Sequence, residues 1–204
     1  VSVGNLAVGG TGKTPMSAWV VSALLEAGAT PALLLRGYGD DEAALHRLWN
    51  PRVPVLIGAD RVEGARRARD AGADCAVLDD GFQHRRLTRT LDVVLLAVED
   101  PMPAPVLPRG PYREPPVSLR RADVVVMTRR SASAAAARER AEALRAAGLL
   151  GDDAAMAGVR LAVRDVVPLA APSQPGETAS AVPAFGSEDL ALPANARARA
   201  LVLT

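Results

Sequence analysis

The sequence predicts an α/β fold in which a doubly wound, mainly parallel sheet carries helices on both faces. Short apolar runs alternate with amphipathic segments of helical period along the chain. The runs have few polar residues at alternate positions, which is typical of parallel strands buried on both sides. A glycine-rich segment joins the first apolar run to the first helical pattern. In such folds, ligands bind beyond the carboxyl ends of the strands.

The elements are expected in the following chain order. The first strand (1–3) precedes a helix at 16–27, because Pro15 suits a first helical turn and Gly28 a helix end. A strand at 32–35, a short helix at 41–48 and a strand at 53–57 follow. An arginine-rich helix at 60–71 leads to a strand at 75–78. A strand at 91–98, a proline-rich loop (101–116), a strand at 122–127 and a helix at 133–147 complete the series.

Composition excludes several classes of protein. The 204 residues are 49% hydrophobic with a net charge of +1, so no basic excess indicates nucleic acid. The single Cys75 excludes an internal disulfide. The longest apolar runs have about eight residues, too few to span a bilayer, so we expect no transmembrane segment in this chain.

The ends predict a piece of a longer protein. The chain begins without Met, inside the expected first strand, and 201–204 resembles a strand just entered. We expect residues 1–165 to form one core and 166–204 to form a linker, rich in Pro, Ser and Ala, with the first strand of a further lobe.

A phosphate-binding loop is the most specific local motif. Its pattern is a small residue, four spacers and Gly-Lys-Thr, filled here by Ala7, Val8, Gly9, Gly10, Thr11, Gly12, Lys13 and Thr14. Glycines let the backbone N–H groups turn towards phosphate oxygens, the lysine reaches the outer phosphates, and the threonine ligates magnesium. Lys13 is the single lysine among 24 basic residues. The loop makes the expected fold one of the P-loop NTPase type.

An acidic motif follows the strand at 75–78. Asp79 and Asp80 stand at a strand end, where a rigid carboxylate can hold Mg²⁺ or its bound water. An Asp-Gly hairpin turn is the alternative, which the phosphate loop upstream makes less favourable. His84 either positions a carboxylate, touches substrate or is a polar loop residue.

Two further segments allow two interpretations each. Asp41 and Glu42 would supply a base for a substrate hydroxyl, although their spacing alone favours a solvated helix start. Arg109 and Arg113 in the proline-rich loop would bind anionic oxygens, or the loop is a plain connector. Parallel topology brings the phosphate loop, residues 36–39, residues 79–84 and the loop after Val98 to one edge of the sheet.

Together these residues resemble the tetraacyldisaccharide 4'-kinase family, the lipid A precursor kinases. The resemblance covers roughly the first 130 residues. It rests on residues 3–15, 36–39, 58–61, 79–84, 107–115 and 121–123, with Leu87 and Arg89. The run Asp-Asp-Gly-Phe-Gln-His at 79–84 is more specific than the phosphate loop.

The resemblance implies ATP- and Mg²⁺-dependent phosphorylation of the 4'-hydroxyl of a tetraacylated glucosamine disaccharide 1-phosphate. The substrate would be met at the cytoplasmic face of the bacterial inner membrane, with the protein bound peripherally. The catalytic residues it implies are Asp41, Asp79, Asp80 and His84, and the metal ligands Thr14, Asp79 and Asp80. ATP would bind at residues 7–14, and the substrate candidates are Asn5, Arg36, Tyr38, Glu42, Arg109 and Arg113. The resemblance thereby favours Asp41 as a base.

The chain also departs from the family pattern. Ala43 replaces a proline, Leu35 a serine and Thr90 an aspartate, and the interval from Gly39 to Asp41 is shorter than in the family. The family's amino-terminal membrane segment and carboxyl-terminal lobe have no counterpart here, so we expect this piece alone to have little or no activity. Two alternatives remain: another P-loop ATPase, or a degenerate nucleotide-binding module without catalysis. A GTPase is disfavoured, because its guanine-binding motif needs a second lysine.

Overall fold

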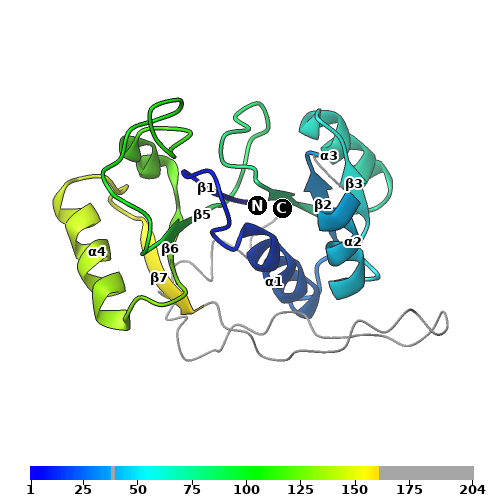
Figure 1. Ribbon diagram of the computed structural model, residues 1–204. Coiled ribbons are helices and arrows are strands. Elements are labelled where there is room, and N and C mark those ends of the chain that lie inside the picture. The colour runs from blue at the N-terminus through cyan, green and yellow to red at the C-terminus, as the bar shows by residue number, and fades with distance from the viewer. Residues whose placement is uncertain (38–39, 161–204) are drawn as a thin grey trace.

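A computed structural model describes residues 1–37 and 40–160. Seven parallel strands form one sheet in the order β3-β2-β4-β1-β5-β6-β7 (Figure 1). The strands are β1 (Ser2–Asn5), β2 (Pro31–Leu35), β3 (Val55–Ile57), β4 (Cys75–Asp79), β5 (Asp92–Ala97), β6 (Val124–Arg129) and β7 (Ala155–Arg160). The helices are α1 (Lys13–Glu26), α2 (Asp40–Trp49), α3 (Arg61–Asp70), α4 (Ala134–Ala146) and the 3₁₀ helix η1 (Pro116–Arg121).

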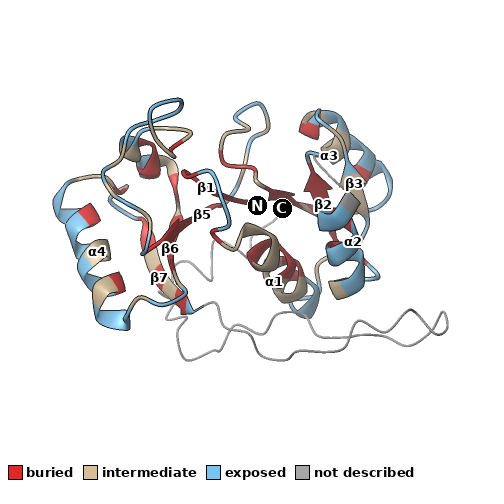
Figure 2. Cartoon of the chain, in the orientation of Figure 1, coloured by how far each residue is buried: buried red, intermediate tan, exposed pale blue. Residues whose placement is uncertain are grey.

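Each face of the sheet has its own apolar core. One core combines side chains of α1 and α2, such as Met16 and Ala43, with alternate strand residues such as Val3 and Val77. The other combines α4 and η1 with the intervening strand residues, such as Val94 and Val125. The inner strands are almost entirely buried, whereas the edge strands β3 and β7 are partly exposed and the helices expose their outer sides (Figure 2). The predicted doubly wound parallel sheet with helices on both faces is therefore confirmed.

The strand order positions the candidate site. β1 lies between β4 and β5, and the chain passes to β2 on one side before it returns through β4 and crosses to β5. In open α/β sheets, ligands bind at such a reversal of strand order, which here lies beyond the carboxyl end of β1. The segment that follows β1 and the segment that follows β4 are therefore neighbours, since the two strands pair from Ser2 with Leu78 to Val3 with Asp79.

The structure adds two elements that the patterns did not predict. β7 pairs with β6 at the sheet edge, although its sequence contains Ala155, Ala157 and Gly158, which have low strand propensity. The 3₁₀ helix η1 occupies the end of the predicted proline-rich loop. β3 begins at Val55 rather than at Val53, because Pro54 contributes only its carbonyl, which accepts from Leu33 N at 2.9 Å. Residues 161–204, including the predicted linker, lie outside the described residues.

No helix in the described part of the chain is long and apolar enough to cross a membrane. Cys75 is free and buried, and burial raises the pKa of its thiol to about 12.

Candidate active site

The loop between β1 and α1 has the geometry of an anion-binding turn. Gly9 and Gly12 take positive φ angles of 125° and 88°, a region that glycine adopts without strain. Gly12 is also the N-cap of α1, and no side chain caps the first N–H groups of the helix. Those N–H groups and the positive end of the helix dipole remain for an anion. A side chain at Gly10 would meet no atom within 4 Å, so the loop is open.

The base of the loop is fixed from inside the protein. Asn5 is fully buried, and its Nδ2 donates to Thr11 Oγ1 at 2.8 Å. Ala7 is buried and bridges Tyr112 of the proline-rich loop, whereas Val8 is exposed. Asn5 was predicted to face substrate, and that role stays a prediction. Its observed contacts place it behind the loop.

Lys13 links the loop to the acidic motif. Its Nζ donates to Gly9 O at 3.4 Å and lies 3.8 Å from Asp80 Oδ1. Thr14 follows in the first turn of α1 and is half-buried. The Thr14 hydroxyl and the Lys13 ammonium group thus adjoin the open loop, and both are needed to bind a metal–phosphate complex.

The two carboxylates that follow β4 differ in their surroundings. Asp79 ends the strand and is buried, and its Oδ1 has no hydrogen-bond partner among the described residues. Asp80 is partly exposed and has a positive φ of 53°. Arg113 Nη1 donates to both Asp80 carboxylate oxygens at 2.7 Å. The buried Asp79 oxygen without a donor is suited to a cation, and the Arg113 guanidinium beside Asp80 is suited to the phosphate ligands of that cation.

Close backbone packing holds the acidic motif against β1. A Cβ at Gly81 would lie 2.6 Å from Leu78 Cβ, and one at Gly4 would lie 2.6 Å from Phe82 Cβ. Neither position has room for a side chain. Gln83 Nε2 donates to Asn5 O at 3.0 Å. The Asp-Asp-Gly-Phe-Gln run is therefore a fixed wall beside the phosphate loop.

Helix α2 brings a second group of acids to this wall. Asp41 is exposed, and Glu42, also exposed, lies close enough to the acidic motif for its pKa to shift. Burial and the nearby Asp79, Asp41 and Asp80 raise the pKa of Glu42, and Lys13 opposes this rise. The short helix that the sequence predicts at 41–48 is thus confirmed, and its first turn adjoins the site.

His46 is a site residue that the sequence patterns did not reveal. Its Nε2 lies 3.0 Å from Asp79 Oδ2, and both side chains are buried, with exposures of 1% and 4%. A single histidine in an Ala-Leu-Arg helix carries no motif, so its partner is visible only in the tertiary structure. One signal was available: His46 follows Glu42 at i+4, which puts the two on the same face of the helix.

The other candidate residues that the structure describes lie on loops. His84 is half-buried with its Nε2 unpartnered among the described residues. Its pKa is lowered by burial and by the nearby charges of Arg61 and Arg86. Arg36 and Arg109 are exposed, in the loop after β2 and in the proline-rich loop respectively. Tyr38 lies outside the described residues.

The geometry suits a metal ion that is shared with a bound phosphate. Among residues 1–37 and 40–160, no three His, Cys, Asp or Glu side chains are arranged to hold a metal by themselves. Mg²⁺ commonly takes one or two carboxylates and completes its shell with water and substrate phosphates. The unpartnered Asp79 Oδ1 and the Thr14 hydroxyl in the first turn of α1 are oxygen donors of that kind.

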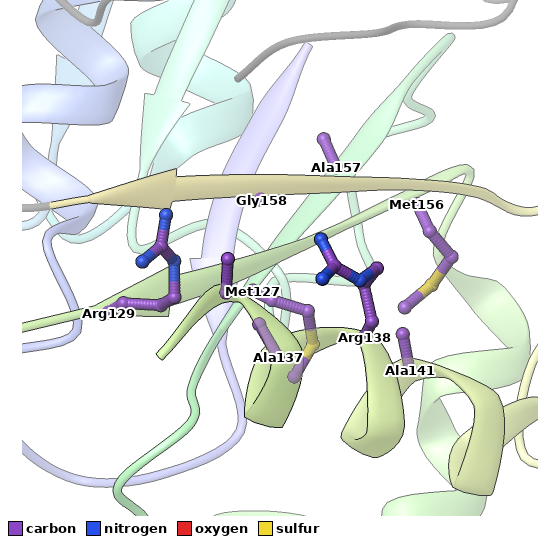
Figure 3. A pocket seen from close by; sticks show the side chains of 9 residues that line it. Met127, Arg129, Ala137, Arg138, Ala141, Met156, Ala157 and Gly158 are labelled. Atoms are coloured by element: carbon purple, nitrogen blue, oxygen red, sulfur yellow. The ribbon is translucent and has the colours of Figure 1, made fainter. Parts of the chain in front are cut away.

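A separate cavity of about 410 Å³ lies between α4, β6 and β7 (Figure 3). Met127, Met156 and several alanines line it, with Arg129 and Arg138 among them. It is at the far edge of the sheet from β1 and contains none of the predicted site residues. The phosphate loop, not this cavity, is the candidate active site.

The fold and the site together define a P-loop nucleotide-binding protein of the α/β class. Residues 1–52 and 39–187 match the family model described as "Tetraacyldisaccharide-1-P 4'-kinase". The chain belongs to this family.

Similar proteins are known from several bacteria. A tetraacyldisaccharide 4'-kinase of Anaeromyxobacter dehalogenans is 47% identical over 170 residues, which are 72% of this chain and 44% of that protein. One from Syntrophus aciditrophicus is 44% identical over 154 residues, 63% of this chain and 41% of that protein. The chain thus spans less than half the length of these curated relatives.

A solved structure has the same fold. The crystal structure of LpxK from Aquifex aeolicus in complex with ATP matches with a TM-score of 0.55 and 35% sequence identity. The match covers 62% of this chain and 46% of that one.

Proposed function

We propose that this chain carries the ATP-binding core of a kinase that phosphorylates the 4'-hydroxyl of a tetraacylated glucosamine disaccharide 1-phosphate. The observation that supports the proposal most is the phosphate loop beside the Asp79–Asp80 wall, in a chain that matches an ATP-bound LpxK with 35% identity over 62% of its length. This reaction would be a step of lipid A synthesis at the cytoplasmic face of the inner membrane.

The residues of the site would divide the work as follows. The loop N–H groups and Lys13 would hold the β- and γ-phosphates of ATP. Thr14 and Asp79 would hold Mg²⁺, with Asp80 beside them, and the ion would neutralise phosphate charge during transfer. Arg113, which is paired with Asp80 in this structure, would be able to contact the transferred phosphoryl group.

Asp41 would act as the general base. It would take the proton of the acceptor hydroxyl as that oxygen bonds to the γ-phosphorus and the bond to the leaving ADP breaks. Glu42, on the same turn of α2, has a raised pKa. His84 would position the acidic motif or contact substrate.

An apolar rim beside the loop supports a lipid acceptor. Residues 101–108 of the proline-rich loop contain no polar side chain. Val106 and Leu107 are 40% and 53% exposed, and Val8 of the phosphate loop is 54% exposed. Val8 N donates to Pro111 O and Leu107 N to Tyr112 O, which joins the two exposed segments through one backbone ribbon. Exposed apolar residues in such a cluster mark an interaction surface.

Two measurements test the proposal. The first is ATP binding by calorimetry with and without Mg²⁺, comparing the parent with Lys13→Ala. The second is transfer of labelled phosphate from ATP to the lipid disaccharide by a kinase of the relatives' full length that carries this core, with and without Asp41→Ala, because this piece alone is expected to have little or no activity. The kinase proposal requires that Lys13→Ala abolish binding and that Asp41→Ala leave it intact while removing transfer. ATP binding without any transfer by that full-length kinase would instead favour the nucleotide-binding module.

A further inference from the structure

A buried polar pair joins helix α2 to the end of strand β4. The pair consists of His46 and Asp79, whose Nε2 and Oδ2 atoms lie 3.0 Å apart. A carboxylate only accepts hydrogen bonds, so the ring nitrogen carries the proton between them. Both side chains are almost completely buried, and water therefore does not compete for the contact.

This contact leaves the two oxygens of Asp79 in different states. Oδ2 has a donor, whereas Oδ1 is buried and has no hydrogen-bond partner among the described residues. The backbone carbonyl of Asp79 also accepts from Arg61 Nη2 at 3.3 Å. A buried carboxylate oxygen without a donor is costly unless a cation or another donor occupies the position. The side chain is thus held from one side, with its other oxygen left for a ligand.

The histidine itself is held in place by its helix. Its ring meets that of Trp49 edge to face, with 6.0 Å between centroids. One turn later, Asn50 Nδ2 donates to Ala18 O at 3.2 Å and Asn50 Oδ1 accepts from Ser22 Oγ at 3.0 Å. These bonds tie the end of α2 to α1, the helix that begins at the phosphate loop. The end of α2 is thus held on α1 by contacts that do not involve Asp79.

We propose that His46 is a positioning residue for Mg²⁺ in the nucleotide complex. It holds Asp79 through Oδ2 so that Oδ1 is presented to the metal ion or to one of its bound waters. Hydrogen bonds to metal-ligating carboxylates fix their orientation and typically change metal affinity by about 10- to 100-fold. This inference rests on the proposed binding of ATP and Mg²⁺ at the loop.

Three variants of the full chain test it. His46→Leu keeps the buried volume but removes the donor, and His46→Gln retains an N–H group near the position of Nε2. Asn50→Leu is the matched control, because it removes another buried polar contact of α2 without touching Asp79. For each variant, affinity for a fluorescent ATP analogue is measured as Mg²⁺ is titrated and again with EDTA, and thermal unfolding is recorded without nucleotide.

The proposal requires a specific pattern. His46→Leu should raise the Mg²⁺ concentration for half-maximal binding by about 10- to 100-fold. Its affinity with EDTA should remain near that of the parent, and His46→Gln should restore most of the Mg²⁺ response. Asn50→Leu should lower the unfolding temperature without changing that response. Should His46→Leu fail to fold, His46→Asn, whose amide is too short to reach Asp79, takes its place.

Other outcomes overturn the inference. An unchanged Mg²⁺ response in His46→Leu would show that the pair does not position the metal site. Equal losses with Mg²⁺ and with EDTA would assign His46 a purely structural role. If the parent itself binds no ATP with Mg²⁺, the proposed function fails first, and this result is distinct from both.

Discussion

Replacement of Gly4 by alanine tests whether the acidic motif is held against β1 as the structure describes. A Cβ at this position would lie 2.6 Å from Phe82 Cβ and 2.8 Å from Phe82 N. Carbon atoms pack at about 3.5–4.0 Å, so the added methyl group is about 1 Å too close. Phe82 is fully buried and the clash includes its backbone, so no side-chain rotation relieves it.

The expected loss follows from this overlap. Overpacking of a core costs about 1–3 kcal/mol, and each kcal/mol shifts the melting temperature of a domain of this size by roughly 2–4 °C. Gly4→Ala should therefore lower the midpoint by about 2–12 °C. Because the backbone at Phe82 must move, Asp79 and Asp80 should move with it, and affinity for ATP with Mg²⁺ should fall as well.

A second strand glycine provides the control. A Cβ at Gly158 in β7 would meet no atom within 4 Å. Alanine is favoured over glycine in a strand by about 0.5–1 kcal/mol, so Gly158→Ala should leave the midpoint unchanged or raise it by about 1–4 °C. Circular dichroism melts of the parent and both variants give the comparison. Equal midpoints for Gly4→Ala and the parent, within about 1 °C, would refute the proposed packing of the motif on β1.

Three further predictions concern the site and its surroundings. Lys13→Ala should abolish ATP binding in calorimetry, whereas Asp41→Ala should bind ATP like the parent. Leu107→Asp should reduce sedimentation with anionic lipid vesicles several-fold and leave ATP binding intact. Leu48→Asp, at a similarly exposed leucine on α2, should not change sedimentation; equal loss in both would contradict a specific lipid contact. Burial would raise the pKa of Glu99, but N–H groups of residues 130–132 donate to it and lower the pKa to about 2. The ionised Glu99 therefore stabilises the folded state fully above its ordinary pKa of 4.5, and this stabilisation is lost as the pH falls towards 2. The urea midpoint of Glu99→Gln should accordingly fall less between pH 5 and pH 3 than the midpoint of the parent.

The local patterns were sufficient for most of the architecture. Strands such as β2 and β5 are continuous apolar runs. Asp60 is the N-cap of α3 and accepts from Val62 N and Glu63 N. β7 was missed because its alanines and glycine give no strand signal. It forms because β6 offers a free edge and its residues have room to pair there.

Part of the candidate site could likewise be predicted from local sequence patterns, and part could not. Gly9, Gly12 and Lys13 lie within one short segment of the sequence, and the two carboxylates lie next to each other in another. Each segment therefore has a sequence pattern that indicates its chemistry. The Arg113–Asp80 ion pair and the His46–Asp79 pair join residues 33 positions apart. No periodicity encodes such distances, since they depend on how the intervening helices pack.

The sequence by itself determined the fold class, the phosphate loop and the acidic strand end, because each is fixed by local backbone preference and by the alternation of apolar and polar residues. Only the tertiary structure decided which oxygen of Asp79 is occupied, that Arg113 is paired with Asp80 and that α2 contributes a histidine to the site. Those contacts arise where the strand order reverses around β1. There, segments distant in sequence are packed together. The partner of each buried polar group therefore depends on which residues lie close in space, not on which residues are close in sequence.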